Sequence, residues 1–358
     1  MKKSLTQLSD GRELIFYDID DSAVRDAVDR RTLQPVPRGS ETRYDPLHAD
    51  WMVVAAHRQN RTFHPPADEC PLCPSDAGRY SEIPAGDYDV VVFENRFPAL
   101  AGEPTPKGRP GGRCEVICFS SDHDRSFAQL PASQAALVLE AWADRTTELY
   151  QRDDIEQVFL FEDRGEERTL VHPHGQIYGY PFVVPRVARV LESALKHRAR
   201  TNRNIFDDLV ARECAESVRL VLETEHWVAF VPYTARWPYE VHLYPRQRVA
   251  DLGALAGPAR DEFPVVYQEV LRRFDALFDG SASPTPYISA WLQAPRRVGR
   301  DEFALHLEVF TARRSATKVK HLAGSEHVMG VSINEISPEQ AAARLRALGE
   351  GQGLTSHA

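Results

Sequence analysis

Two histidines that flank a single proline form the segment of this chain best suited to chemistry. They open the run His172-Pro173-His174-Gly175-Gln176. Residues two apart in an extended segment point to the same side, so we expect both imidazoles to address one site. Pro173 cannot donate a ladder hydrogen bond, which predicts an edge strand or a special strand. Beside the Gln176 amide, the pair indicates a nucleophile or a ligand pair next to an oxygen-rich substrate, with a chance surface pair as the alternative.

A Cys-x-x-Cys pair, Cys70 and Cys73, has the spacing that places two thiolates on one metal ion. It is the only pair with this spacing in the sequence, so the remaining ligands of a tetrahedral site must be histidines. His123 and His172 both lie in segments that we expect to be ordered. The sequence therefore predicts a structural zinc site of Cys70, Cys73, His123 and His172. A redox pair or a buried thiol pair without metal is the alternative.

The composition is that of a globular protein with a substantial core. The chain has 358 residues, of which 42% are hydrophobic, enough for roughly two domains or one large fold. Its net charge of −9 and its pI near 5.8 argue against a general binder of nucleic acid or of membrane surfaces. We expect no signal peptide, and no stretch approaches the roughly 20 apolar residues of a membrane span. Five cysteines, an odd number, fit a reducing compartment, so we expect a cytoplasmic protein.

Hydrophobic patterns predict the strands and helices that must position these residues. Residues 114–119 alternate as a half-buried strand should, and residues 157–161 form another strand that leads into the histidine motif. Between them, the apolar spacing predicts a long helix from Pro131 to about Arg152. A helical pattern then follows over residues 184–216.

The second half of the chain repeats this order. Residues 239–245 precede a predicted helix at 259–278, and further strands are expected at 286–291 and 303–310. We therefore expect an internal duplication of a strand–helix–strand unit. Alternating strands with helices between them favour an α+β fold with a largely antiparallel sheet flanked by helices.

Several motifs in a consistent order make the chain resemble the galactose-1-phosphate uridylyltransferase family. Besides the histidine motif and the Cys-x-x-Cys pair, they include segments 118–123 and 235–240. This family belongs to the histidine-triad superfamily and is built from two related halves. The resemblance implies two histidine-triad-like halves, residues 1–190 with the metal site and the nucleophile and residues 191–358 on the sugar side.

The resemblance also implies an enzyme that exchanges UMP between UDP-glucose and galactose 1-phosphate. Members of the family follow a ping-pong route through a uridylylated histidine, which here is His174. The backbone carbonyl of His172 is expected to accept a hydrogen bond from the other ring nitrogen of His174. Gln176 would bind the phosphoryl oxygens as charge builds, and Thr169 would assist the departing phosphate.

The other substrate contacts are carried over from the same resemblance. Arg58 and Arg61 match arginines that reach the nucleotide from the partner subunit, which implies a homodimer. Lys320 aligns with a lysine on the sugar side, for which a solvated loop charge is the alternative. The uridine pocket is expected to consist of Leu72, Phe93, Asn95 and Phe97, with apolar walls and one amide that reads the base. Ordinary core packing is the alternative for Phe93 and Phe97.

The chain departs from the family pattern at two places. Asp163 stands where a phosphate-contacting asparagine is usual, so its carboxylate would weaken anion binding unless one of two neighbouring arginines compensates. Some relatives also carry a second iron or zinc site from one glutamate and three histidines. Here His306 fits one of these positions, but Leu292 cannot ligate and Glu308 replaces another histidine, so we expect that second site to be absent.

Two other functions stay open on the sequence. Asp163 and the altered residues at the sugar end are compatible with a related nucleotide-sugar phosphorylase or transferase that uses a different nucleotide or acceptor. The other alternative is a non-enzymatic, zinc-stabilised binding protein. The presence of both His174 and Gln176 counts against that alternative, because a decayed site has no reason to keep both.

Overall fold

The computed structural model describes residues 1–34, 40–60, 65–76, 78–101, 111–165, 170–278 and 284–349. The chain forms two compact units. The first unit comprises Met1–Glu162, Glu167–Glu192 and Ala294–Arg300. The second unit comprises Asp163–Glu166, Ser193–Gln293 and Asp301–Ala358. The predicted division into two histidine-triad-like halves at residue 190 stays a prediction.

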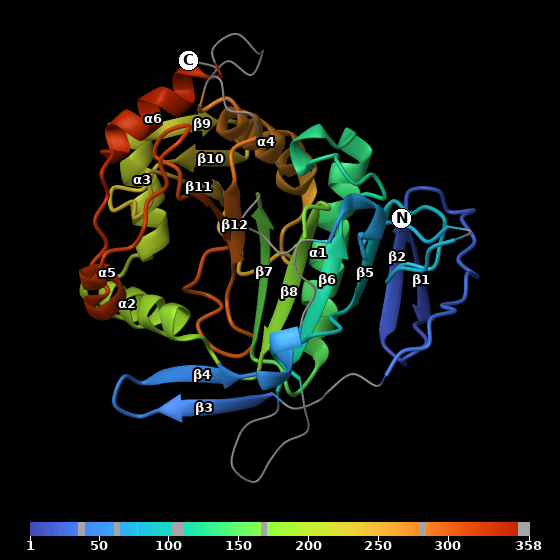
Figure 1. The fold of residues 1–358 in the computed structure, drawn as a ribbon. Coiled ribbons are helices and arrows are strands. Elements are labelled where there is room, and N and C mark those ends of the chain that lie inside the picture. The colour runs from blue at the N-terminus through green and yellow to red at the C-terminus, as the bar shows by residue number, and fades with distance from the viewer. Residues whose placement is uncertain are drawn as a thin grey trace. The chain divides into compact units, whose positions relative to one another are not determined.

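An antiparallel sheet forms the centre of the first unit (Figure 1). Its strands follow the order β1-β2-β5-β6-β8-β7, and each neighbouring pair is antiparallel. A separate hairpin consists of β3 and β4. The strands are β1 Lys2–Gln7, β2 Glu13–Asp18, β3 Glu41–Asp45, β4 Asp50–Val54, β5 Val90–Glu94, β6 Arg113–Cys118, β7 Gln157–Arg164 and β8 His174–Tyr180. Short 3₁₀ helices lie at Ala56–Asn60, Ala67–Glu69 and Phe127–Gln129.

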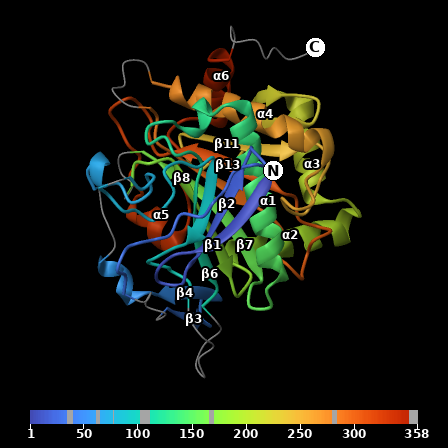
Figure 2. The same cartoon turned by 90° about the vertical axis from the view of Figure 1, so that its right-hand side faces the viewer.

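Helix α1, Ala132–Gln151, packs on this sheet and contacts β2 and β5 (Figure 2). Its buried positions include Val138, Leu139 and Trp142, which follow the apolar spacing of the sequence. Pro131 stands at the N-cap and Arg152 at the C-cap. The predicted helix from Pro131 to about Arg152 is therefore confirmed.

In the second unit, five antiparallel strands follow the order β12-β13-β11-β10-β9. Helix α4 contacts β10, and helix α6 contacts β9 and β11. The fully buried aromatic rings of Trp227, Phe263 and Trp291 pack together in its core. The strands are β9 Leu220–Glu223, β10 Trp227–Phe230, β11 Tyr239–Pro245, β12 Tyr287–Leu292 and β13 His306–Thr311. The helices are α3 Ile205–Glu216, α4 Gly257–Asp275, α5 Gly324–Met329 and α6 Pro338–Ala347.

The helical pattern predicted over residues 184–216 is interrupted in the structure. Helix α2 covers Pro185–Thr201, and α3 begins at Ile205. Asn204 causes the break, because its side-chain oxygen accepts hydrogen bonds from the backbone N–H groups of Phe206 and Asp207 and so caps a new helix. The prediction of one continuous helical stretch missed this cap.

The strand–helix–strand order of the two units is the same. In the first unit, β6 is followed by α1, β7 and β8; in the second, β11 is followed by α4, β12 and β13. The fold is α+β with extensive antiparallel sheet flanked by helices, as the alternating strands predicted. In the described ranges, no helix is both long and apolar enough to span a bilayer.

Candidate active site and metal centre

Strand β8 presents the two principal site residues on one face of the sheet. His174 and Gln176 are partly exposed, whereas Gly175 between them and Ile177 after them are buried on the opposite face. Gly175 lets the strands pack closely, because an added Cβ would lie 3.0 Å from the carbonyl oxygen of Phe161. The alternation therefore aims an imidazole and an amide at the same region.

The register of three strands aligns Gln176 with two apolar residues. Phe93 on β5 lies opposite Val116 on β6, and Val116 lies opposite Gln176 on β8. His174 occupies the next row of the same face, opposite Cys118. Because these side chains share one face, the sheet itself builds an apolar floor next to the two polar groups.

The His174 ring is held by the backbone of its own segment. Its Nδ1 lies 2.7 Å from the carbonyl oxygen of His172. A carbonyl oxygen only accepts hydrogen bonds, so Nδ1 carries the proton and the lone pair of the neutral ring is on Nε2. This is the hydrogen bond that the resemblance predicted, and it prepares Nε2 as a nucleophile.

The Gln176 amide is oriented by a neighbour on the same strand. The hydroxyl group of Tyr178 donates a hydrogen bond to Oε1 of Gln176 at 3.2 Å. The contact favours the orientation in which the amide nitrogen, Nε2, is left to donate a hydrogen bond to a ligand. A donor of this kind suits an anionic oxygen in the pocket.

A pocket in the first unit contains His174 and Gln176 together with most of the predicted uridine contacts. Its predicted lining residues are Arg58, Leu72, Phe93, Asn95, Phe97, His174 and Gln176. Asn95 accepts a hydrogen bond at Oδ1 from the backbone N–H of Phe97, at 2.8 Å, which leaves its amide N–H₂ as the donor side. The structure thus brings these residues to one place, with apolar walls and an amide as expected.

Five further residues line this pocket that the sequence did not single out. They are Pro71, Glu82, Arg96, Val116 and Leu170. Arg96 stands in the sequence between the predicted pocket residues Asn95 and Phe97, and this position was the signal that could have identified it. Glu82 had no such signal, because its place beside the pocket comes from a loop. Its carboxylate pairs with Arg12 at 2.6 Å and with Arg31 at 2.8 Å, which offsets its negative charge near an anion site.

Several predicted site residues are not among those that line the pocket. Arg61 and Thr169 lie outside the described residues. Asp163 lies near the end of β7, and its neighbour Arg164 is engaged by Asp275 and by the carbonyl oxygen of Thr285. These contacts of Arg164 therefore compete with its predicted role, which is to offset the negative charge of the Asp163 carboxylate.

Lys320 is buried in the second unit, with 6% of its surface exposed, so it is not a solvated loop charge. Its ammonium group donates to the carbonyl oxygens of Arg236 and Ile333, at 2.7 and 2.6 Å, and pairs with Glu326 at 3.0 Å. Three such partners match the three donors of an ammonium group. The geometry fits a residue that holds a loop in place.

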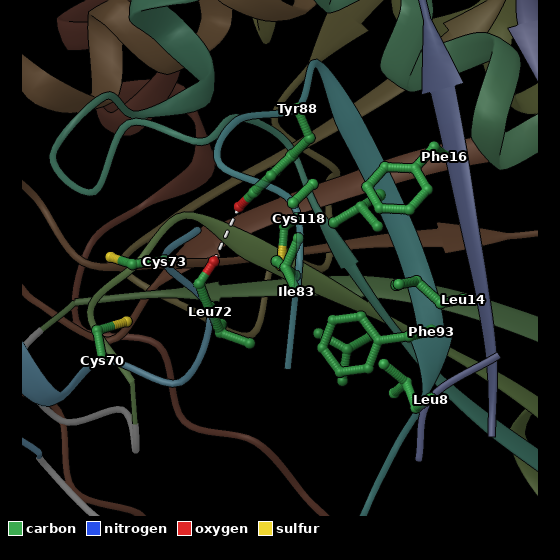
Figure 3. Close-up of a cluster of buried hydrophobic side chains, with 13 residues drawn as sticks. Leu8, Leu14, Phe16, Cys70, Leu72, Cys73, Ile83, Tyr88, Phe93 and Cys118 are labelled. Atoms are coloured by element: carbon green, nitrogen blue, oxygen red, sulfur yellow. Dashed lines mark hydrogen bonds between the residues drawn. The ribbon is translucent and has the colours of Figure 1, made fainter. Parts of the chain in front are cut away.

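The predicted metal ligands converge in the first unit. Each of Cys70, Cys73, His123 and His172 offers a ligand atom, and these atoms lie within 4.8 Å of one another. The two cysteines stand at one end of a buried apolar cluster, away from Leu14 and Phe16 (Figure 3). The Cys73 sulfur lies 3.3 Å from Nδ1 of His123 and 3.5 Å from Nδ1 of His172.

Hydrogen bonds give His172 the tautomer that a metal ligand needs. Its Nε2 donates to the carbonyl oxygen of Ser120 at 2.8 Å, so the lone pair of the neutral ring is on Nδ1, facing Cys73. Burial lowers the pKa of His172 to about 4, which keeps the ring neutral. The pKa of Cys73 is raised to about 12 by burial and by Cys70, so a bound cation would be required to hold the thiolate form.

The expectation that both motif histidines address one site is wrong. His172 is almost fully buried among the cysteines, whereas His174 lines the pocket. The reason is that β8 begins at His174, so His172 does not follow the strand alternation. The edge-strand prediction is also wrong, because β8 lies between β6 and β7. Pro173 precedes the strand and leaves its ladder intact.

Comparisons with known proteins identify the family of this chain. Residues 31–184 match the family model described as galactose-1-phosphate uridyl transferase, N-terminal domain, and residues 191–355 match its C-terminal domain. Galactose-1-phosphate uridylyltransferase from Streptomyces lividans is 51% identical, over 98% of this chain and 99% of that protein. The protein of the same name from Thermotoga maritima is 36% identical, over 86% of this chain and 98% of that protein.

Solved structures give the same answer for the fold. A uridylyltransferase structure aligns with a TM-score of 0.75 and 27% identity, covering 87% of this chain and 99% of that chain. An ADP-glucose phosphorylase from Arabidopsis thaliana with bound ADP-glucose aligns with a TM-score of 0.66 and 20% identity, covering 86% of this chain and 98% of that chain. At this identity, the second likeness concerns the fold alone.

The fold and the site together define a group-transfer enzyme, because a pocket ends in an imidazole whose backbone hydrogen bond prepares it as a nucleophile. The chain belongs to the galactose-1-phosphate uridylyltransferase family, and its enzymatic activity is that of a uridylyltransferase.

Proposed function

We propose that this enzyme exchanges UMP between UDP-glucose and galactose 1-phosphate through a uridylylated His174. The observation that carries the proposal is the hydrogen bond from His174 Nδ1 to the His172 carbonyl oxygen, in a residue that lines the pocket. The names of the relatives, galactose-1-phosphate uridylyltransferases, support the acceptor. The apolar walls and the Asn95 amide suit a flat base with carbonyl acceptors such as uracil.

The reaction divides into two displacements at one phosphorus atom. Nε2 of His174 attacks the α-phosphorus of UDP-glucose, and the bond to the oxygen of glucose 1-phosphate breaks. A phosphate oxygen of galactose 1-phosphate then attacks the same phosphorus, the phosphorus–nitrogen bond breaks, and UDP-galactose leaves. Imidazole suits both steps, because it is nucleophilic when neutral and is a good leaving group once protonated.

Charge at the phosphorus must be balanced by donors in the pocket. Gln176 supplies an amide, and Arg58 supplies a guanidinium group that lines the same pocket of its own chain. The resemblance predicts instead that Arg58 and Arg61 reach the pocket of a partner subunit. We retain the homodimer as part of the proposal, and a single-chain mass in light scattering would contradict it.

We further propose that Cys70, Cys73, His123 and His172 bind one structural zinc ion. Thiolate and imidazole donors at this spacing suit a tetrahedral zinc site, and the His172 tautomer fits a ligand. With four protein ligands, zinc would stabilise the fold and leave no open position for chemistry. A reducing, cytoplasmic location belongs to the same proposal, since all five cysteines are free thiols.

The test of the covalent route is intact-protein mass spectrometry after incubation with UDP-glucose. We expect the mass to increase by one UMP and to return to its starting value when galactose 1-phosphate is added, with release of UDP-galactose. His174→Asn should abolish the adduct. His48→Asn is the matched control, because His48 is an exposed imidazole that pairs with Asp45 outside the pocket.

The alternative functions predict different masses. An adduct that inorganic phosphate discharges, and galactose 1-phosphate does not, would reassign the enzyme as a phosphorylase. An adduct that persists in His174→Asn would overturn the proposed nucleophile.

A further inference from the structure

A buried carboxylate, that of Glu82, lines the same pocket as His174. Among the described residues that line this pocket, Glu82 is the only acidic one. It is 7% exposed, so its oxygen atoms are largely removed from water. A negative charge near a diphosphate weakens the binding of that diphosphate, so this carboxylate needs a partner in another part of the ligand.

Glu82 lies on the side of the pocket that adjoins a second cavity of the first unit. The two cavities have four lining residues in common, Pro71, Glu82, Arg96 and Phe97. Neither His174 nor Gln176 is among the described residues that line the second cavity. The carboxylate therefore stands apart from the imidazole that attacks phosphorus, on the side of Phe97, which is one of the predicted uridine contacts.

The backbone and two arginines hold the Glu82 side chain in place. The backbone N–H of Glu82 donates to the carbonyl oxygen of Pro71 at 3.0 Å. Arg12 donates to Oε2 at 2.6 Å, and Arg31 donates to Oε1 at 2.8 Å. Arg96 lies 4.0 Å from Oε1, which is too far for a hydrogen bond. Because each carboxylate oxygen has two lone pairs, Oε1 can accept one more hydrogen bond.

The other polar side chains of the pocket are less suited to accept a hydrogen bond from a ligand. The guanidinium groups of Arg58 and Arg96 carry no acceptor. The amide oxygens of Asn95 and Gln176 each accept a hydrogen bond from a neighbouring group of the protein already. The lone pair of the catalytic imidazole is needed for phosphorus. Glu82 is therefore the acceptor that this pocket offers to a hydroxyl or N–H group.

A nucleotide sugar carries its hydrogen-bond donors outside the diphosphate, whose oxygens only accept. The nucleoside part of a uridine diphosphate sugar has the ribose hydroxyl groups and the N3–H group of uracil, and the hexose hydroxyl groups lie at the other end of the molecule. Carbonyl oxygens flank N3–H on both sides and would be repelled by a carboxylate. Ribose hydroxyl groups have no such neighbours, and carboxylates bind them in dinucleotide sites.

We propose that Oε1 of Glu82 accepts a hydrogen bond from a ribose hydroxyl group of the nucleotide, so that Glu82 selects ribonucleotides over deoxyribonucleotides. The inference rests on the proposed function, because it takes a uridine diphosphate sugar as the ligand of this pocket. Pairing with Arg12 and Arg31 offsets the charge of the carboxylate and lets it approach a nucleotide. The contact acts on binding, since the ribose hydroxyl groups are remote from the reacting phosphorus.

The first experiment needs no variant, so it stands even if a substitution prevents folding. The natural chain is incubated with subsaturating UDP-glucose, 2′-deoxy-UDP-glucose or 3′-deoxy-UDP-glucose, and intact-protein mass spectrometry follows the rate of adduct formation. We expect at least one deoxy analogue to react roughly 10- to 100-fold more slowly, because it leaves a buried acceptor unpaired. Equal rates for all three would overturn the inference and leave the proposed function standing. Absence of an adduct from UDP-glucose itself would overturn both.

A variant tests whether Glu82 is the source of this preference. Glu82→Gln keeps the shape of the side chain and removes its charge, so the preference for UDP-glucose over the slower analogue should fall by about 10-fold. The loss should appear as a higher KM for UDP-glucose, with kcat nearly unchanged.

Asp29→Asn is the matched control for the loss of an ion pair. Asp29 pairs with the same Arg31 at 2.9 Å and is not among the described residues that line the pocket. Its variant should keep the preference of the natural chain. An unchanged preference in Glu82→Gln, or an equal loss in Asp29→Asn, would overturn the assignment to Glu82.

Discussion

Two histidines that differ by only two positions have opposite tautomers in this enzyme. His174 donates from Nδ1 to a carbonyl oxygen, which leaves Nε2 for a phosphorus atom. His172 donates from Nε2 to the carbonyl oxygen of Ser120, which leaves Nδ1 for a metal ion. In each case, a backbone carbonyl selects which nitrogen can act. The backbone carbonyl beside each imidazole, and not the residue type, therefore decides which of the two roles the histidine takes.

The contact between Tyr178 and Gln176 gives a prediction for catalysis. Tyr178→Phe removes the hydroxyl that orients the amide, and we expect kcat to fall by roughly 3- to 10-fold while the UMP adduct still forms. Gln176→Ala removes the amide itself and should cost about 100-fold. The measurement is steady-state transfer of UMP to galactose 1-phosphate.

Tyr80→Phe is the matched control for the loss of a hydroxyl, because Tyr80 is exposed and is not among the residues that line the His174 pocket. An unchanged kcat in Tyr178→Phe, with a large loss in Gln176→Ala, would show that the amide is held by other contacts.

The buried His172 predicts a loss of stability in acid. Its pKa is about 4 in the folded chain, because of burial, against an ordinary value of 6.5. The contribution of the neutral ring is complete above about pH 6.5 and is lost as the pH falls through about 4. The free energy of unfolding should decrease by up to about 3 kcal/mol over this window, and release of a bound metal would act in the same direction.

Urea unfolding at several pH values between 7 and 4 measures this dependence. His172→Gln should unfold with a flatter dependence on pH than the natural chain, whereas His321→Gln, at an exposed site, should keep the natural slope. Equal slopes in all three chains would rule out His172 as the source.

At the scale of elements, a buried ion pair joins α1 to the sheet beneath it. Arg145 on α1 binds Glu115 on β6 through two hydrogen bonds, from Nε at 2.9 Å and from Nη2 at 2.7 Å. Glu115 is 1% exposed and Arg145 is 4% exposed. The Arg145 and Arg113 charges hold the pKa of Glu115 below its usual range although burial opposes this. The ion pair fixes β6 to α1, and β6 carries Val116, which lies between Phe93 and Gln176 in the sheet.

Removal of one partner should therefore destabilise the fold strongly. We expect Arg145→Ala to lower the free energy of unfolding by about 3–5 kcal/mol, because Glu115 would remain buried with less compensation. Arg152→Ala is the control, since Arg152 pairs with Asp154 at a partly exposed site and should cost less than about 1 kcal/mol. Similar denaturation midpoints for the two variants would contradict the role of this pair.

At the scale of the molecule, the metal group of the first unit joins three distant parts of the chain. Cys70 and Cys73 come from a loop before β5, His123 follows β6, and His172 precedes β8. Tyr88 adds to this junction, since its hydroxyl donates to the carbonyl oxygen of Leu72 and lies 3.0 Å from Nε2 of His172. A zinc ion here would therefore hold the pocket wall at Leu72 next to the start of the catalytic strand.

Loss of one ligand should release the metal and lower stability together. We expect Cys70→Ser to lose about one zinc ion per chain and to melt several degrees below the natural chain, because metal binding is linked to folding. Cys214→Ser is the matched control, a free cysteine in α3 that is remote in sequence from the four ligands. Unchanged zinc content in Cys70→Ser would mean that the ligands are wrongly assigned.

The sequence by itself was sufficient to predict the fold class and the family of this protein. Local patterns were sufficient for α1 and for the antiparallel α+β class, because apolar spacing is a property of neighbouring residues. The Cys-x-x-Cys spacing and the histidine motif were sufficient to name the four residues that converge as a metal group. The motif order was also sufficient for the family, since separate motifs at consistent spacing rarely coincide by chance.

Only the tertiary structure decided how these residues are arranged in space. The start of β8 at His174 separates the two histidines, and strand register aligns Phe93, Val116 and Gln176 in one row. The pocket position of Glu82 and the burial of Lys320 depend on chain segments that meet only after folding. A residue's neighbours along the chain are set by the sequence, whereas its neighbours across a sheet and its exposure to water are set by packing.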